Sequence, residues 1–152
     1  MPSKKAKAKP RAKPAKTLGK QAGYSQKTLR DKLGIKNGIA LAIIDAPQNY
    51  AELTELSAFD TELDLEEYDF LHFFTQRAIG LGHAFPVLSK RLKQDGMLWI
   101  SWPKGSSGVE TDLNENIVRE IGLANGLVDV KVAAIDDVWS GLKFVYRLKD
   151  RE

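Results

Sequence analysis

The sequence contains no cysteine. Disulfide bonds, thiolate zinc sites, iron–sulfur clusters and cysteine nucleophiles are therefore excluded, and nothing argues for export. Long apolar runs are also missing, since the longest, such as 39–44, are about strand length, so we expect no membrane-spanning segment. The basic N-terminus lacks the apolar stretch that a secretory signal needs. We therefore expect a cytoplasmic protein with one domain in its 152 residues.

Acidic residues are missing from the first twenty positions, which hold seven lysines and one arginine. Leu18 is the only large aliphatic residue there after Met1, so burial cannot offset the entropy of ordering this segment. We predict a disordered basic tail over 1–20, a short helical lead-in over 21–36 and an α/β domain over 37–152. Beyond the tail, 15 basic and 20 acidic residues leave a formal charge of about −5.

The tail predicts weak, sequence-independent contact with DNA or RNA, because lysine and arginine release counterions from phosphates. No aromatic residue precedes Tyr24, so the tail offers no base stacking. A solubilising extension and binding to the acid-rich segment 52–69 of the same chain remain open alternatives. The candidate nucleic-acid-binding residues are Lys4, Lys5, Lys7, Lys9, Arg11, Lys13, Lys16 and Lys20.

Alternating apolar and amphipathic segments predict the fold. The runs 39–44, 68–74 and 97–102 are typical of strands buried on both faces, while 77–93 and 112–124 have helical spacing. The final strands, 127–135 and 142–148, are separated by only six residues, which is too short for a crossover helix. We therefore predict an α/β, Rossmann-like three-layer sandwich with a mostly parallel five-stranded sheet and a C-terminal antiparallel hairpin.

Two family resemblances follow. The segment 92–100, LKQDGMLWI, looks like the "L-K-P-G-G" turn and fifth strand of S-adenosylmethionine (SAM)-dependent methyltransferases, and the final hairpin is similar to that fold's last two strands. A closer resemblance, over nearly all of the domain, is to a bacterial domain family of unknown function. The segments that carry it are 22–25, 99–104, 107–109, 111–113, 126–132 and 136–144. Together they imply a degenerate, truncated methyltransferase-like fold.

The first loop departs from the methyltransferase pattern. In that fold a glycine-rich loop follows the first strand and lets the backbone approach the cofactor, whereas 45–50 here reads Asp-Ala-Pro-Gln-Asn-Tyr. One βα unit is also missing from the pattern, because 52–67 leads directly into the strand at Tyr68. We therefore predict no cofactor, with SAM disfavoured, and a non-enzymatic binding or regulatory module. The alternative is a small methyltransferase-like enzyme or cofactor binder that uses the strand-end crevice.

Four loops are expected at the carboxyl ends of the strands, where open α/β sheets bind ligands. Among them, 102–111 combines small residues, a lysine and a helix start, as an anion cradle would, and we expect Asp112 to cap that helix. An ordinary surface turn is the competing interpretation. Trp139 either stacks on a ligand ring or closes the hairpin as an apolar plug. The candidate residues for an unidentified small molecule or protein are Asp45, Arg77, Trp102, Lys104, Ser106, Ser107, Asp136 and Trp139.

The two histidines, His72 and His83, lie on different predicted elements without metal-ligand spacing. We predict structural roles for both, no metal site, and no identifiable catalytic residue. The acid-rich segment 52–69 lacks the pattern of a calcium loop, so we interpret it as a solvated face.

Overall fold

A five-stranded sheet organises the computed structural model, which describes residues 27–151. Its order is β1-β2-β3-β5-β4, in which β1 (Leu41–Ile44), β2 (Tyr68–Phe74) and β3 (Leu92–Pro103) pair in parallel. β5 (Trp139–Tyr146) is antiparallel to both β3 and β4 (Leu127–Ala134). The predicted α/β, Rossmann-like class and terminal hairpin are confirmed, and the reversed strand β5 lies between β3 and β4.

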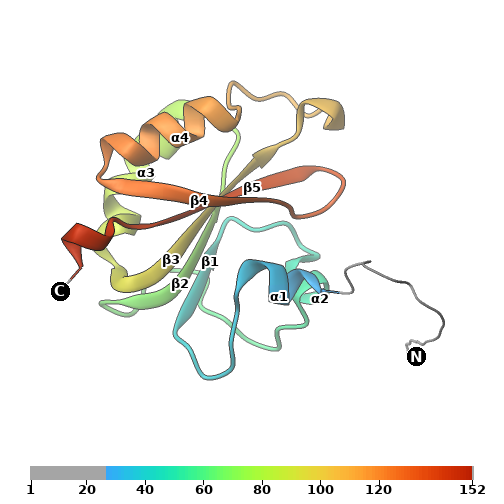
Figure 1. Cartoon of the computed structure of the whole chain (residues 1–152). Coiled ribbons are helices and arrows are strands. Elements are labelled where there is room, and N and C mark those ends of the chain that lie inside the picture. The colour runs from blue at the N-terminus through green and yellow to red at the C-terminus, as the bar shows by residue number, and fades with distance from the viewer. Residues whose placement is uncertain (1–26, 152) are drawn as a thin grey trace, which may run out of the picture.

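Helices cover both faces of the sheet (Figure 1). α3 (Ala78–Lys90) and α4 (Glu115–Ala124) share one apolar core with the sheet, to which Phe85, Val118 and Phe144 belong. The short helices α1 (Leu29–Leu33) and α2 (Tyr50–Thr54) share a second core on the opposite face. Strands buried on both faces read as continuous apolar runs, which is why β2 matches its predicted bounds.

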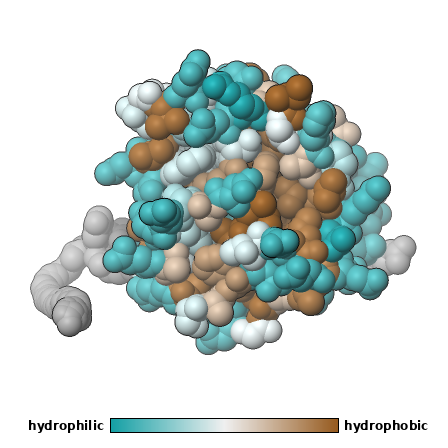
Figure 2. Space-filling view, turned by 180° about the vertical axis from the view of Figure 1, so that it is seen from behind, coloured by the Kyte–Doolittle hydropathy of each residue, from teal (hydrophilic) through white to brown (hydrophobic). Residues whose placement is uncertain are grey.

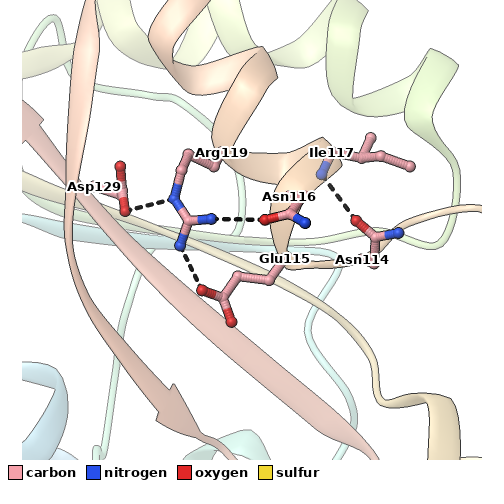
Figure 3. Close-up of polar contacts among 6 residues, drawn as sticks. All are labelled: Asn114, Glu115, Asn116, Ile117, Arg119 and Asp129. Atoms are coloured by element: carbon pink, nitrogen blue, oxygen red, sulfur yellow. Dashed lines mark hydrogen bonds and ion pairs between the residues drawn. The ribbon is translucent and has the colours of Figure 1, made fainter.

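Polar contacts fix α4 against β4 (Figure 3). Asn114 caps the helix, because its Oδ1 accepts a hydrogen bond from the Ile117 backbone N at 2.9 Å. Arg119 donates from Nε to Asp129 Oδ2 on β4 at 2.8 Å and also pairs with Glu115 one turn earlier. Arg119 therefore links α4 to the sheet through contacts that the charge pattern of the sequence alone does not predict.

The predicted cap at Asp112 is wrong. Asp112 Oδ1 instead accepts from the backbone N of Ala78, the first residue of α3, at 2.8 Å. Thr111 Oγ1 donates to the Gln76 carbonyl at 2.6 Å in the same place. The segment before α4 thus caps α3, a contact between residues 34 apart that local spacing cannot predict.

Asp95 and Gly96, which lie in the segment that resembles the methyltransferase turn, both belong to β3. The pairing with β2 shifts register between Tyr68 and Phe70, so the turn signal marks a strand irregularity. A Cβ on Gly96 would stand 2.9 Å from the Asp69 carbonyl oxygen, so close backbone approach explains the glycine. At the lead-in, α1 begins after Thr28, whose hydroxyl caps it, while the segment 21–26 lies outside the described residues.

The segment between α2 and β2 runs along the free edge of β1. Asp60 and Ala42 form a parallel bridge, in which Ile43 N donates to the Asp60 carbonyl at 2.8 Å. Tyr68 donates its hydroxyl to Asp60 Oδ2 at 2.6 Å, and Asp69 pairs with Lys93 at 3.2 Å. Part of the acid-rich segment is therefore structural rather than a purely solvated face. One helical turn and this bridged segment stand where the sequence suggested a lost βα unit.

Gly122 allows α4 to approach the sheet. A Cβ added there would meet Phe144 Cε1 at 2.0 Å, and Phe144 is fully buried. We expect Gly122→Ala to lower the free energy of unfolding by roughly 1–3 kcal/mol, the usual cost of overpacking. Gly82→Ala is the matched control, because nothing lies within 4 Å of its Cβ and alanine favours a helix by about 1 kcal/mol. Urea unfolding of the two variants should show opposite signs, and equal effects would contradict this packing argument.

The basic tail over 1–20, with all eight candidate nucleic-acid-binding residues, lies outside the described residues. Contact with DNA or RNA and the domain boundaries therefore stay predictions. None of the helices within 27–151 is long and apolar enough to cross a membrane.

Candidate functional site

A groove of about 460 Å³ lies beside the carboxyl end of β1. Its walls come from the ends of β1 and β2, from α3, and from the segment after the Asp60 bridge. Six of its nine lining residues are apolar, which suits a ligand with a flat apolar ring. The lining residues are Ile44, Asp45, Thr61, Glu62, Leu63, Phe73, Ala84, Val87 and Leu88. Figure 2, seen from behind Figure 1, shows an apolar, hollowed area surrounded by hydrophilic residues.

Asp45 directly follows β1 and adopts the left-handed backbone region, with φ of 60°. This conformation is easy for glycine and costs other residues energy, although aspartate tolerates it better than most. The chain then turns sharply, because the Tyr50 backbone N donates to the Pro47 carbonyl at 3.1 Å. The first loop therefore adopts at its first residue a backbone conformation that a glycine would give, without containing a glycine.

The polar side chains that line the groove are acidic or neutral. Asp45 and Glu62 supply carboxylates, Thr61 supplies a hydroxyl, and no lysine, arginine or histidine belongs to the lining set. Asp45 and Glu62 are both exposed, so they can approach a ligand without a prior cost of desolvation. This donor set suits a ligand that carries positive charge or hydroxyl groups next to an apolar ring.

A buried polar chain lies behind the first loop, on the α2 side of the sheet. The Tyr50 hydroxyl and His72 Nδ1 share a hydrogen bond of 2.8 Å, and His72 Nε2 and Ser101 Oγ share one of 2.7 Å. Burial lowers the pKa of His72 to about 3 and raises the pKa of Tyr50. The imidazole is therefore neutral at physiological pH, with one ring nitrogen donating and the other accepting. The structural role predicted for His72 agrees with this placement.

The predicted ligand-binding residues lie along the carboxyl edge of the sheet, but most lie outside the groove, which only Asp45 lines. Arg77 is 3.7 Å from Glu110 at the start of α3. Trp102 is buried in the α3–α4 core. Trp139 packs edge-to-face on Phe74 at 5.1 Å, as the plug interpretation expects.

Two of the remaining predicted residues hold loops together. Ser107 Oγ donates to the Lys104 carbonyl at 2.7 Å within the short 3₁₀ helix Gly105–Ser107, in which Ser106 is exposed. Asp136 Oδ1 accepts from the backbone N of Val138 and of Trp139, each at 2.8 Å, which closes the final hairpin. The segment after β3 is thus a hydrogen-bonded turn in which the Ser107 hydroxyl is already engaged, and anion binding there stays a prediction.

Sequence reasoning missed most of the groove. Besides the neighbouring Ile44, its other lining residues come from 61–63, β2 and α3, and apolar residues such as Val87 read as an ordinary helix face. A partial signal was present in Glu62, within the acid-rich segment, but nothing local indicated that it lies near Asp45. Within 27–151, no group of three or more His, Cys, Asp or Glu side chains is placed to hold a metal ion, and His83 is exposed on α3.

Comparison with known proteins identifies the fold. No family model matches the chain, and no curated protein matches its sequence, so the resemblance to a family of unknown function gains no support. Among solved structures, a ribosomal protein L11 methylase from Lactobacillus delbrueckii subsp. bulgaricus is 12% identical, with a TM-score of 0.50 over 78% of this chain and 75% of that one.

Two further methyltransferases have similar folds. The magnesium protoporphyrin IX methyltransferase from Synechocystis PCC 6803, with bound SAH, is 11% identical, with a TM-score of 0.51 over 72% of this chain and 75% of that one. The precorrin-6y C5,15-methyltransferase from Geobacter metallireducens GS-15 is 9% identical, with a TM-score of 0.51 over 78% and 86%.

These findings correct two predictions. The favoured interpretation, a non-enzymatic binding or regulatory module, is contradicted by the fold similarity to methyltransferases, which favours the alternative. The prediction of no cofactor is contradicted as well, because solved structures of this fold contain SAH or SAM. The absence of glycine from the first loop misled both, since Asp45 itself adopts the left-handed conformation. Residues 27–151 thus have the Rossmann-like fold of SAM-dependent methyltransferases.

Proposed function

We propose that this protein is a methyltransferase-like enzyme that binds SAM in the groove beside β1. The observation that carries the proposal is the groove itself, apolar along its walls, with Asp45 and Glu62 lining it at the carboxyl end of a parallel strand. Ligands of open α/β sheets bind at this edge. The volume of about 460 Å³ falls within the range of small-molecule and cofactor sites.

The chemistry of the lining residues fits SAM. Its adenine ring is flat and apolar on its faces, and the side chains of Phe73 and Val87 are available for packing against it. Its ribose offers hydroxyl donors, and its sulfonium and ammonium groups carry positive charge, for which the Asp45 and Glu62 carboxylates are acceptors. When bound, SAM supplies an electrophilic methyl group.

The protein's own residues bind and orient in this proposal. The carboxylates of Asp45 and Glu62 hold polar groups of the ligand, while the apolar wall from β2 and α3 excludes water from its ring. The strained backbone at Asp45 fixes where its carboxylate lies relative to the strand end, because a residue held in this region has few alternative conformations.

Calorimetric titration of the full chain with SAM and SAH tests the proposal. We expect Asp45→Asn and Glu62→Gln each to raise the dissociation constant about 10-fold, the equivalent of about 1.4 kcal/mol. Glu66→Gln is the control, because it removes the same charge from an exposed position outside the groove. No heat of binding for the wild type, or equal weakening by all three substitutions, would contradict a site at the groove.

A further inference from the structure

Tyr50 is the first residue of α2 and is buried in the core on the α1–α2 face of the sheet, while the groove lies on the α3 face. It directly follows the first loop, five positions after Asp45, and is 1% exposed. The same ring packs edge-to-face on Phe59 at 5.8 Å. Phe59 directly precedes Asp60, the residue that bridges β1 and leads into the wall containing Glu62. Tyr50 thus contacts both segments that supply carboxylates, through its backbone N to the Pro47 carbonyl in the first loop and through its ring to Phe59.

Because the Tyr50 hydroxyl is buried, it needs a hydrogen-bond partner, and a residue of the sheet provides it. His72 on β2 accepts or donates at Nδ1, and its other nitrogen meets Ser101 on β3, so a single chain of hydrogen bonds joins the loop to two strands. Each of the three residues is at least 99% buried. Around them lie Phe70, Phe74 and Trp99, so the nearest rings carry no charge that could replace these partners.

We propose that Tyr50, His72 and Ser101 act as one positioning unit that holds Asp45 and Glu62 in place at the groove. This inference rests on the proposed function for its ligand. Removing either end of the chain leaves a buried polar atom of His72 without its partner, which costs more than the bond itself contributed. Relaxation around His72 then frees the first loop, which carries Asp45. Through Phe59 it also frees the segment that carries Glu62. None of the three residues touches the ligand in this proposal.

A double-mutant cycle tests whether the three residues act as a unit. Tyr50→Phe keeps the ring and removes the hydroxyl, and Ser101→Ala removes the opposite end of the chain. We expect each to raise the dissociation constant for SAM about 10-fold, with the double variant no weaker than the more severe single one. Tyr146→Phe is the matched control, because it removes a tyrosine hydroxyl that donates to the Ser89 carbonyl and lies outside the groove. Effects that simply add, or a control that weakens SAM binding equally, would overturn the proposal.

Amide hydrogen exchange of the ligand-free protein separates this inference from the proposed function. We expect Tyr50→Phe to accelerate exchange about 10-fold in 45–49, where Pro47 has no amide, and in 61–63, whereas Tyr146→Phe leaves both segments unchanged. If the wild type binds no SAM but shows this pattern, the proposed function fails and the positioning unit stands. If exchange in these segments is unaffected by Tyr50→Phe, the positioning unit fails whatever the wild type binds.

Discussion

Acidification from pH 7 to pH 4.5 is expected to destabilise the protein by roughly 2–3 kcal/mol through His72 alone. The folded state holds the pKa of this side chain at about 3, against 6.5 in the unfolded chain. Between these two pH values His72 is protonated in the unfolded state and neutral in the folded state. Stability is therefore independent of His72 above about pH 6.5, and it falls as pH decreases from there toward 3.

The physical cause of this dependence is burial without a compensating charge. Tyr50, Ser101, Phe74 and Trp99 surround the imidazole, and none of them carries a negative charge that could stabilise an imidazolium. Stacking on Phe74 at 4.3 Å contributes packing but no such charge. Protonation of a buried ring of this kind therefore costs free energy that its surroundings do not offset.

Urea unfolding at several pH values measures the effect. His72→Asn and His72→Gln remove the titrating group, so their stability relative to the wild type should improve by roughly 2–3 kcal/mol between pH 7 and pH 4.5. Carboxylates elsewhere contribute equally to all proteins and cancel in this difference. His83→Asn is the control, because His83 is exposed and should leave the dependence unchanged. Parallel curves for the wild type and both His72 variants would show that His72 does not set the acid sensitivity.

Filling the groove is expected to lower SAM affinity more than about 100-fold, since a bulky side chain occupies the space that the ligand needs. Ala84 on α3 is half-buried and lines the groove, so Ala84→Trp places an indole in the groove. The melting temperature should change by only a few degrees, because the new ring covers apolar side chains such as Val87, which is 53% exposed.

His83→Trp is the matched control for Ala84→Trp. It adds the same indole to the neighbouring position of α3, which is exposed and does not line the groove. Isothermal titration with SAM should detect no binding to Ala84→Trp and wild-type affinity for His83→Trp. Wild-type affinity for Ala84→Trp would place the ligand somewhere else on the molecule.

The fold was predictable from the sequence where one local pattern decided the outcome. β2 matches its expected bounds because both of its faces are buried, and the terminal hairpin follows from the short gap before β5. Prediction failed where a residue interacts with a segment far away in the sequence instead of with its sequence neighbours. Asp112 has the spacing of a helix cap, yet its carboxylate reaches the start of α3, and Gly96 serves a close approach between strands rather than a turn.

The candidate site was predictable only at Asp45. The strand-end rule selects that residue, but Glu62 and Val87 come near it through the topology, which no local pattern encodes. The first loop was misread because its glycine-type conformation is adopted by an aspartate. Tyr50 and Ser101 were not among the candidate residues, since isolated polar residues within apolar segments reveal their partners only when strands are placed side by side.

The most direct measurement is a crystal structure of the full chain grown with saturating SAH. The predicted result is the adenosine part of SAH in the groove, with its adenine ring packed between Phe73 and Val87. Its ribose hydroxyls are expected on the Asp45 or Glu62 carboxylate. A nucleoside bound at another place on the molecule would contradict this assignment. So would an empty groove, provided that calorimetry of the same sample also detects no binding.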